Sequence, residues 1–310
     1  MLNVMVIEQA SKIFLLRKYE TMKSHLRLFY LCSAVCIIHP AFADYTGEAG
    51  IGYSKLKDTP SNDKISYQKL GATFYFDMIQ TSDGPLAEAA FLNPTSNFNF
   101  NFDQWKYEYP ASSAKQKQTL IGLGFVNSSH NIEFNIKFGD TKHTFSPNAL
   151  SAKSDDLSFG INFYPAKGQS IGISHDTSSF DDNVTNDKIT DDHIFYRQLL
   201  TLAAQQYLSI EIGHENTKYA YKDGYGPDYA TKINDIQATY YISRETGFLF
   251  RYAKYNSDDS SGADGNLMSI GIESFVTPNV ELGFGYLKYS ADSALDEDTK
   301  GFVATLASRF

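Results

Sequence analysis

Apolar and polar residues alternate along most of this chain. Ile132 and Phe134 alternate with charged or polar neighbours, and the same period of two recurs over 157–164 and 280–287. That period is typical of a β-strand with one apolar face. It predicts about fourteen strands, with sixteen if residues 80–96 hide a hairpin and twelve if the N-terminal strands pair loosely. The predicted strands are 45–56, 65–79, 97–109, 117–126, 131–143, 156–165, 169–176, 191–203, 206–219, 233–243, 247–256, 266–275, 280–290 and 298–310.

Connections between the predicted strands alternate between short and long from about residue 127 onward. Asn127–His130 and Thr277–Asn279 are short, whereas Ser178–Asp191 and Tyr221–Lys232 are long and rich in Asp, Asn, Ser and Gly. Transmembrane barrels have short turns at one end and long loops at the other. Because no linker divides the chain, the sequence predicts one all-β domain over 44–310, a transmembrane antiparallel up-and-down β-barrel.

The composition supports this fold class. The chain has 310 residues, of which 15% are aromatic and 42% hydrophobic, which excludes a disordered protein. After the N-terminal region, no apolar run reaches the roughly 18 residues that a membrane helix needs. Periodicity alone does not say which face meets lipid. The many Phe and Tyr residues favour aromatic girdles on the outside, and side chains cannot fill a barrel of this width. We therefore expect apolar faces outside and polar faces in the lumen.

The N-terminal region has the features of an export signal. Basic residues follow Met22, an apolar core comes next, and residues 41–43 form an A-x-A cleavage motif. This order is that of a secretory signal peptide, and the core is too short to span a membrane. We expect cleavage after residue 43, and interpret residues 1–21 either as an over-extended start or as an unusually long n-region. Cys36 lacks the sequence context of a lipoprotein attachment site.

Charge and cysteine content exclude several classes of function. Cys32 and Cys36 both lie in the signal, so the mature chain has no disulfide framework or Cys-based metal site. The net charge is −9; residues 1–43 hold five Lys/Arg and two Asp/Glu, so the mature chain of 310 − 43 = 267 residues carries 22 − 34 = −12. An acidic chain lacks the basic face of a general nucleic-acid binder.

The last predicted strand has an alternating apolar pattern that ends at the final residue. Phe302, Ala304, Leu306 and Phe310 share one face. The pattern resembles the C-terminal β-signal of bacterial outer-membrane barrels, which implies that Phe302, Leu306 and Phe310 act as the assembly signal read by the barrel-assembly machinery. Ser308 departs from that pattern, because an apolar or aromatic residue is more common there.

Residues 80–96 interrupt the pattern at the end of the barrel where turns should be short. Residues 85–92 can form two helical turns, with Pro85 near the first position and Ser82 or Asp83 as the cap. One interpretation is a re-entrant structural loop or a strand with a bulge. The other is a constriction element inside the lumen. Its candidate residues are Gly84, Pro85, Glu88 and Phe91.

The stretch from Gly84 to Asn93, GPLAEAAFLN, resembles a segment of the general bacterial porin family of Gram-negative proteobacteria. The order of features also matches that family: a signal, an opening strand, this segment, and hairpins up to a terminal Phe. The resemblance covers the mature chain in layout and about ten residues in motif. It implies a passive outer-membrane channel and assigns neither a substrate nor a defined site.

The predicted strand 97–109 changes phase. Phe98 and Phe102 occupy even positions, whereas Trp105 and Tyr107 occupy odd ones. A β-bulge near Asp103 would switch the faces. Alternatively, the strand leaves the membrane at this point and the later aromatic residues form an interfacial belt. We favour the second interpretation.

Charged residues on the polar strand faces are candidates for the lining of the lumen. Both signs occur, so these residues can create a transverse field that selects solutes, or they can pair with one another and hold the wall in shape. With −12 overall, we expect a mild cation preference. The pore-lining candidates are Glu133, Lys137, Arg197, Glu211, Glu215, Arg251, Glu273 and Arg309.

Two alternatives to a channel stay open. His193 adjoins Asp191 and Asp192, and His175 adjoins Asp176, so a hydrolase at the barrel rim is one alternative if such side chains meet in space. A closed barrel that interacts with lipopolysaccharide is the other, because acidic loops can bind Ca²⁺ or Mg²⁺ weakly and bridge lipid phosphates. The loop acids are Asp181, Asp182, Asp187, Asp191, Asp192, Asp258, Asp259 and Asp264.

The sequence therefore favours an outer-membrane porin that passes small polar solutes and ions. It predicts no enzyme activity, cofactor, metal site or nucleic-acid partner. The expected partners are outer-membrane lipid and lipopolysaccharide, the assembly machinery and the solutes. A chain of this length favours a monomer over the longer trimeric porins.

Overall fold

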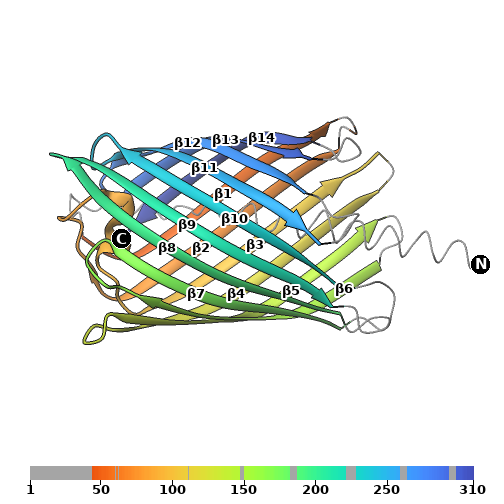
Figure 1. Ribbon diagram of the computed structural model, residues 1–310, viewed down its shortest axis with the longest axis horizontal. Coiled ribbons are helices and arrows are strands. Elements are labelled where there is room, and N and C mark those ends of the chain that lie inside the picture. Colours follow the sequence, from red (N-terminus) through yellow and green to blue (C-terminus); the bar gives the residue numbers. More distant parts are fainter. Residues whose placement is uncertain are drawn as a thin grey trace, which may run out of the picture.

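In a computed structural model of the chain, fourteen strands of the described residues form one closed barrel. Each strand pairs antiparallel with its neighbours in sequence, and the last pairs with the first (Figure 1). The predicted all-β up-and-down barrel of fourteen strands is confirmed. The predicted signal, its cleavage motif and residues 1–21 lie outside the described residues. The structure describes 44–59, 61, 63–110, 112–146, 150–181, 187–220, 228–258, 264–292 and 298–310.

Short helical turns join β2 to β3, and all other described elements are strands. No helix in the described residues is long and apolar enough to span a membrane. The elements are β1 (Tyr45–Thr59), β2 (Lys64–Ile79), η1 (Leu86–Glu88), α2 (Ala89–Leu92), β3 (Asn97–Glu108), β4 (Ser113–Asn127), β5 (Ile132–Ser146), β6 (Leu150–Phe163), β7 (Gln169–Asp181), β8 (Lys188–Ala203), β9 (Gln206–Ala220), β10 (Tyr229–Tyr241), β11 (Thr246–Ser257), β12 (Gly265–Thr277), β13 (Val280–Ala291) and β14 (Asp298–Arg309).

Alternation along each strand separates an apolar outer face from a polar inner one. On β5, Phe134 and Phe138 are 44% and 49% exposed on the outside. Glu133 and Lys137 lie between such residues and therefore face the lumen, because successive side chains of a strand point to opposite sides. An exposed apolar wall around a polar lumen is the arrangement that lipid requires.

Several strands extend further toward the long-loop end than the sequence predicts. β5 ends at Ser146 and β6 begins at Leu150, so most of the predicted loop 145–155 is strand. The sequence predicted a loop here because this stretch is rich in Ser, Asp and Lys, which are common in loops. Its residues nevertheless continue the ladder, with Lys142 opposite Lys153.

The barrel closes where β1 pairs with β14, and the final residue extends this ladder by one step. Phe310 donates its backbone N–H to Gly47 O at 2.9 Å, and the N–H of Gly47 returns to Phe310 O at 2.8 Å. A Cβ placed on Gly47 would lie 2.5 Å from Phe310 Cε2, so only glycine allows the ring to lie over β1. Phe302 and Phe310 are both exposed on the outer face, and Leu306 shares that face.

The strand with the apparent phase change is regular. β3 pairs with β2 and β4 without a register shift, so no bulge lies near Asp103. The later aromatic residues are buried on the lumen side and form no belt on the outer face. Trp105 is only 4% exposed, and its ring centroid lies 4.2 Å from that of Tyr67. Both predicted alternatives were wrong, because β3 carries aromatic side chains on its lumen face near the long-loop end as well as on its outer face.

Candidate functional site

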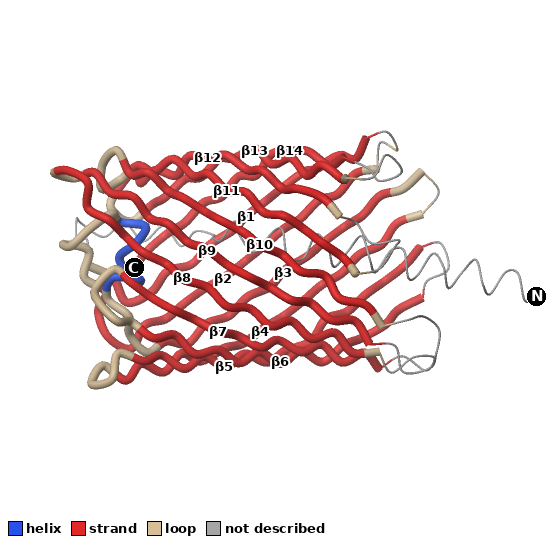
Figure 2. The backbone as a smooth tube through the Cα atoms, viewed as in Figure 1, coloured by secondary structure: helices blue, strands red, loops and turns tan. Residues whose placement is uncertain are grey.

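Residues 80–96, which we call the inner segment, fold inside one end of the barrel. Figures 1 and 2 show the helical turns at the end that holds the short turns and the C-terminus. Pro85 precedes η1, and α2 follows it directly. The predicted two helical turns over 85–92 are therefore present, whereas the predicted cap is wrong: no side chain caps either helix.

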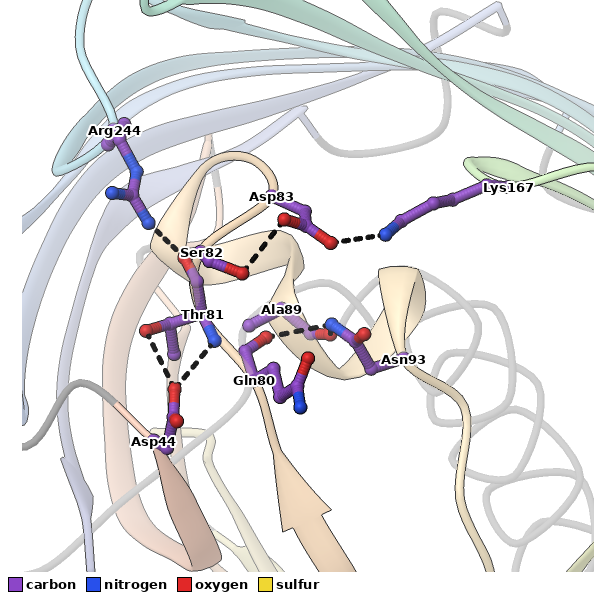
Figure 3. Close-up of polar contacts among 9 residues, drawn as sticks. All are labelled: Asp44, Gln80, Thr81, Ser82, Asp83, Ala89, Asn93, Lys167 and Arg244. Atoms are coloured by element: carbon purple, nitrogen blue, oxygen red, sulfur yellow. Dashed lines mark hydrogen bonds and ion pairs between the residues drawn. The ribbon is translucent and has the colours of Figure 1, made fainter.

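Ser82 and Asp83 have other partners. Ser82 Oγ donates to Asp83 Oδ1 at 2.8 Å, and Asp83 forms an ion pair with Lys167 in the β6–β7 turn (Figure 3). The hydrogen bond from Lys167, and then the one from Ser82, holds the pKa of Asp83 below its ordinary value. Both side chains of this ion pair, which we call the Asp83–Lys167 anchor, are exposed, so its contribution to stability is small and screened by salt.

Backbone contacts bind the first part of the inner segment to the barrel rim. Arg244, in the β10–β11 turn, donates to the carbonyls of Gly84 and Thr81, and its own carbonyl accepts the N–H of Leu86 at 2.8 Å. Figure 3 shows Arg244 reaching the segment from one side and Asp44 from another. Asp44 Oδ1 accepts the N–H of Thr81 at 3.0 Å.

Glu88 is the most buried charged residue of the inner segment, at 2% exposure. Its Oε2 accepts a hydrogen bond from Arg197 Nη2 at 2.5 Å, and its Oε1 accepts one from Tyr241 Oη at 2.9 Å. Arg197 belongs to β8, whereas the segment enters between β2 and β3, six strands away around the ring. Glu88 therefore ties the segment to the far wall of the lumen.

Arginine side chains also hold the segment from other strands. The guanidinium of Arg197 lies 4.4 Å from the ring centroid of Phe91, a cation–π contact. Arg309 of β14 donates to Leu86 O at 2.8 Å. Its guanidinium also lies 3.6 Å from Glu48 Oε2. The inner segment is thus fastened to three separate regions of the wall.

All eight predicted pore-lining residues lie on the lumen face, but in different surroundings. Arg197 and Arg309 contact the inner segment, and Glu211 lies 3.9 Å from Arg197. Arg251 pairs with Asp235 at 2.9 Å. Glu273 on β12 interacts with Tyr241, which donates to Glu88. Glu133 accepts hydrogen bonds from Asn162 and Tyr164 on β6 and just after it, Glu215 lies on β9 and Lys137 on β5.

Tyr241, Arg244 and Asp235 are functional candidates that the sequence analysis missed. Tyr241 is an aromatic residue at a strand end, and Arg244 is a turn residue. Nothing in the sequence around either residue indicates that it contacts a distant segment. Asp235 had a usable signal. It falls on the polar face of its strand by the same alternation that identified Arg251.

Charges divide unequally between the two faces of the wall. On the described lumen face, carboxylates outnumber basic groups. The lumen carboxylates are Glu48, Asp58, Asp77, Asp103, Glu133, Asp156, Asp176, Asp191, Glu211, Glu215, Asp235, Glu273 and Glu281, and the basic residues are Lys69, Lys137, Arg197, Arg251 and Arg309. Most lysines lie instead on the outer face near the long-loop end, so the lumen is more acidic than the net charge indicates.

The predicted hydrolase clusters do not form as expected. Asp191 and His193 face the lumen, whereas Asp192 faces outward. His175 also faces outward, away from Asp176, and its Nδ1 lies 2.7 Å from Asp192 Oδ1. The other ring nitrogen of His175 lies 3.2 Å from the hydroxyl of Thr177. The structure thus brings together a hydroxyl, an imidazole and a carboxylate that the sequence did not connect.

The acidic loops are only partly described. Asp182 and Asp259 lie outside the described residues. Asp258 Oδ1 accepts the N–H of Ala230 at 2.6 Å, and Asp264 Oδ1 accepts that of Ser257 at 2.6 Å. These two carboxylates therefore bind strand ends, which accounts for them without a cation.

Comparison with known proteins identifies the fold. No family model matches the chain, and no curated protein matches its sequence. The outer-membrane protein Omp33 of Acinetobacter baumannii has a TM-score of 0.51 at 16% identity, over 86% of this chain and 99% of that one. The toluene transporter TodX of Pseudomonas putida gives 0.54 at 8%, over 84% and 88%. A TodX deletion mutant gives 0.57 at 8%, over 86% and 90%.

These likenesses place the barrel among the folds of bacterial outer-membrane channels. The predicted resemblance to a porin family is confirmed at the level of the fold. Identities of 8% to 16% carry the fold alone, so the solute and the mechanism have to be argued from the residues of this chain.

Proposed function

We propose that the protein is a porin of the outer membrane, in which small polar solutes and ions diffuse passively through the lumen. The apolar outer wall suits lipid, and the charged inner wall suits water. Passage requires neither a catalytic group nor a cofactor. The short turns and the C-terminus lie on the periplasmic side, after removal of the predicted signal, and the barrel functions as a monomer.

The contact of Glu88 with the far wall carries this proposal. A channel of this kind needs a lumen that is narrowed, yet lined by polar groups that a solute can contact. The inner segment narrows the lumen, because Glu88 reaches Arg197 on the far wall, where the two charges pair with each other. The polar groups that a solute contacts are then those of the surrounding wall, where carboxylates outnumber basic residues.

The excess of lumen carboxylates supports a preference for cations. Arg251 is neutralised by Asp235 at 2.9 Å, and Arg197 by Glu88 at 2.5 Å. Because these two arginines are paired, the other carboxylates determine the electrostatic potential of the lumen. Carboxylate linings select cations in channels generally.

Current through a planar lipid bilayer tests the proposal. The purified protein should give stepwise, ohmic conductance, and the reversal potential in a potassium chloride gradient should show cation preference. Heat-modifiable migration on a gel confirms in parallel that the barrel is folded. A folded protein that carries no current would overturn the channel, and a reversal potential of anionic sign would overturn only the selectivity.

The Asp192–His175–Thr177 chain favours a second candidate, a hydrolase on the outer wall. Carboxylate, imidazole and hydroxyl follow one another in the order of a catalytic triad. Against this candidate, the strand N–H groups beside Thr177 belong to the β6–β7–β8 ladder and are not free to stabilise an oxyanion. Hydrolysis of a short-chain ester by the purified protein, lost in His175→Ala and kept in His214→Ala, would favour the enzyme.

A further inference from the structure

Four lysines stand in one row across the outer wall. Lys288 lies opposite Lys300, Lys300 opposite Lys57, and Lys57 opposite Lys64. The row crosses β13, β14, β1 and β2, all four side chains are exposed, and it lies at the long-loop end of the barrel. With neighbouring strands about 4.8 Å apart, the row is roughly 15 Å long. We call these four residues the lysine row.

Direct opposition of like charges is unfavourable in an antiparallel sheet. Among the described residues, carboxylates lie close enough to reduce this repulsion only at the two ends of the row. Lys288 Nζ lies 3.6 Å from Asp298 Oδ2, and Glu108, opposite Lys64, forms its ion pair with Lys106 at 2.5 Å. Lys57 and Lys300, in the middle, form no ion pair with any described residue. The centre of the row is therefore suited to an anion from outside the chain.

The row borders the apolar outer wall. Phe302 lies two residues from Lys300 on the same face of β14 and is 57% exposed. Tyr286 lies two residues from Lys288 on β13, with its ring centroid 5.5 Å from that of Phe302. A ligand of this surface meets cationic groups at one level and aromatic rings directly below. That combination suits a lipid with an anionic headgroup. Its phosphate would lie at the level of the lysines, and its acyl chains would lie below, at the level of the aromatic rings.

The opposite side of the barrel lacks this arrangement although it has lysines at the same end. Lys232 lies between Asn216 and Asn256, and Lys254 between Asn234 and Asn266. Both lysines are exposed on the outer face. They therefore provide a matched control, because they share the residue type, the face and the end of the barrel, but no lysine lies directly opposite either of them.

We propose that the lysine row is a binding site for the phosphate groups of an outer-leaflet lipid, of the phosphorylated lipid A type. Ammonium groups from neighbouring strands contact the phosphates, and Phe302 and Tyr286 contact the upper acyl chains. The site is independent of the lumen and of solute passage. It assigns lipid binding to a basic surface, rather than to the acidic loops that the sequence suggested.

Native mass spectrometry of the purified protein in detergent tests this assignment. Diphosphoryl lipid A, lipid A lacking both phosphates, and inorganic phosphate are titrated separately. The Lys57→Gln/Lys300→Gln variant is compared with Lys232→Gln/Lys254→Gln, and heat-modifiable migration confirms folding of each. We expect the wild type and the control variant to bind diphosphoryl lipid A equally, and the row variant to bind it at least fivefold more weakly.

Each other outcome overturns the proposal. Equal binding by the two variants would mean that the lysine row does not recognise the lipid. Equal binding of the dephosphorylated lipid would mean that the barrel takes up lipid through its apolar wall alone. Inorganic phosphate bound as tightly as lipid A would assign a free-anion site instead. If the row variant does not fold, Lys300→Gln alone replaces it, with Lys254→Gln as its control.

Discussion

Glu88 and Arg197 are 109 residues apart in the sequence, and their side chains meet at 2.5 Å inside the barrel. One belongs to the inner segment between β2 and β3, and the other to the far wall. The pair therefore decides where the segment lies across the lumen. Because Glu88 is almost completely buried, its carboxylate depends on Arg197 and Tyr241 for the hydrogen bonds that water would otherwise supply.

Glu88→Gln should loosen the inner segment. The amide keeps the size of the side chain but loses the charge-assisted hydrogen bond with Arg197, which is worth about 1.5–3 kcal/mol. We expect the free energy of unfolding, measured by urea titration in detergent, to fall by this amount, and the conductance to rise or become noisy. Glu211→Gln is the control, since Glu211 lies 3.9 Å from Arg197 and on β9. An unchanged conductance in Glu88→Gln would contradict the assigned role.

Arg244→Ala should free the first part of the segment. The change removes the donors to Gly84 O and Thr81 O, leaving these carbonyls to water. We expect faster proteolysis between residues 80 and 96, with the barrel itself intact on a gel. Glu245→Ala, in the same turn, should leave the rate of proteolysis unchanged. Equal rates in all three proteins would show that Arg244 does not hold the segment.

The Asp83–Lys167 anchor should depend on pH in a defined direction. The hydrogen bond from Lys167 lowers the pKa of Asp83, so its charge is present at neutral pH and its contribution is lost as the pH falls through that lowered value. Asp83→Asn and the wild type should therefore differ in current noise at pH 7 and low salt, and the difference should shrink as the pH is lowered below the ordinary range of an aspartate. A difference that stayed constant over the whole acidic range would exclude the charge as its cause.

Lys137→Glu should strengthen cation preference. Lys137 faces the lumen on β5, and no described residue forms an ion pair with it, so reversal of its charge changes the potential that a solute meets. We expect the reversal potential in a salt gradient to move toward the cation value. Lys142→Glu is a matched control on the outer face of the same strand, and should leave the reversal potential unaltered. Equal shifts in both variants would point to surface charge instead.

Gly47→Val should weaken closure of the barrel. The new side chain would displace the Phe310 ring, at a cost of about 1–3 kcal/mol for an overpacked contact. The predicted result is a lower urea midpoint and slower refolding, followed by heat-modifiable migration. Ala49→Val, one outward position further along β1, should fold at the wild-type rate. Normal refolding of Gly47→Val would show that the ring over β1 is dispensable.

The barrel was predictable because its cause is repeated along the chain. The alternation seen at Ile132 and Phe134 recurs in each strand, and one register error would turn a whole apolar face into the lumen. Strand ends at the loop side were less predictable. There, residues such as Asp155 are polar on a strand that has passed the apolar belt, so composition no longer separates strand from loop.

The site was predictable only in part. Strand parity placed Arg197 and Arg309 in the lumen, and the interruption at 80–96 marked the segment. Parity did not show that both arginines bind this segment, because their partners are distant in sequence and the contacts depend on the curvature of the closed barrel. The same limit applies to the lysine row, since Lys57 and Lys300 become neighbours only when β14 pairs with β1.

A channel narrowed by the inner segment is tested most directly by the conductance of the wild type beside that of a variant in which Ser-Gly-Ser replaces residues 82–93. Both are purified, checked for folding on a gel, and measured in the same planar bilayer. We expect ohmic steps in the wild type and steps several times larger in the variant, because the segment narrows an open lumen. Two folded barrels that carry no current, or equal steps in both, would show that the segment does not narrow an open channel.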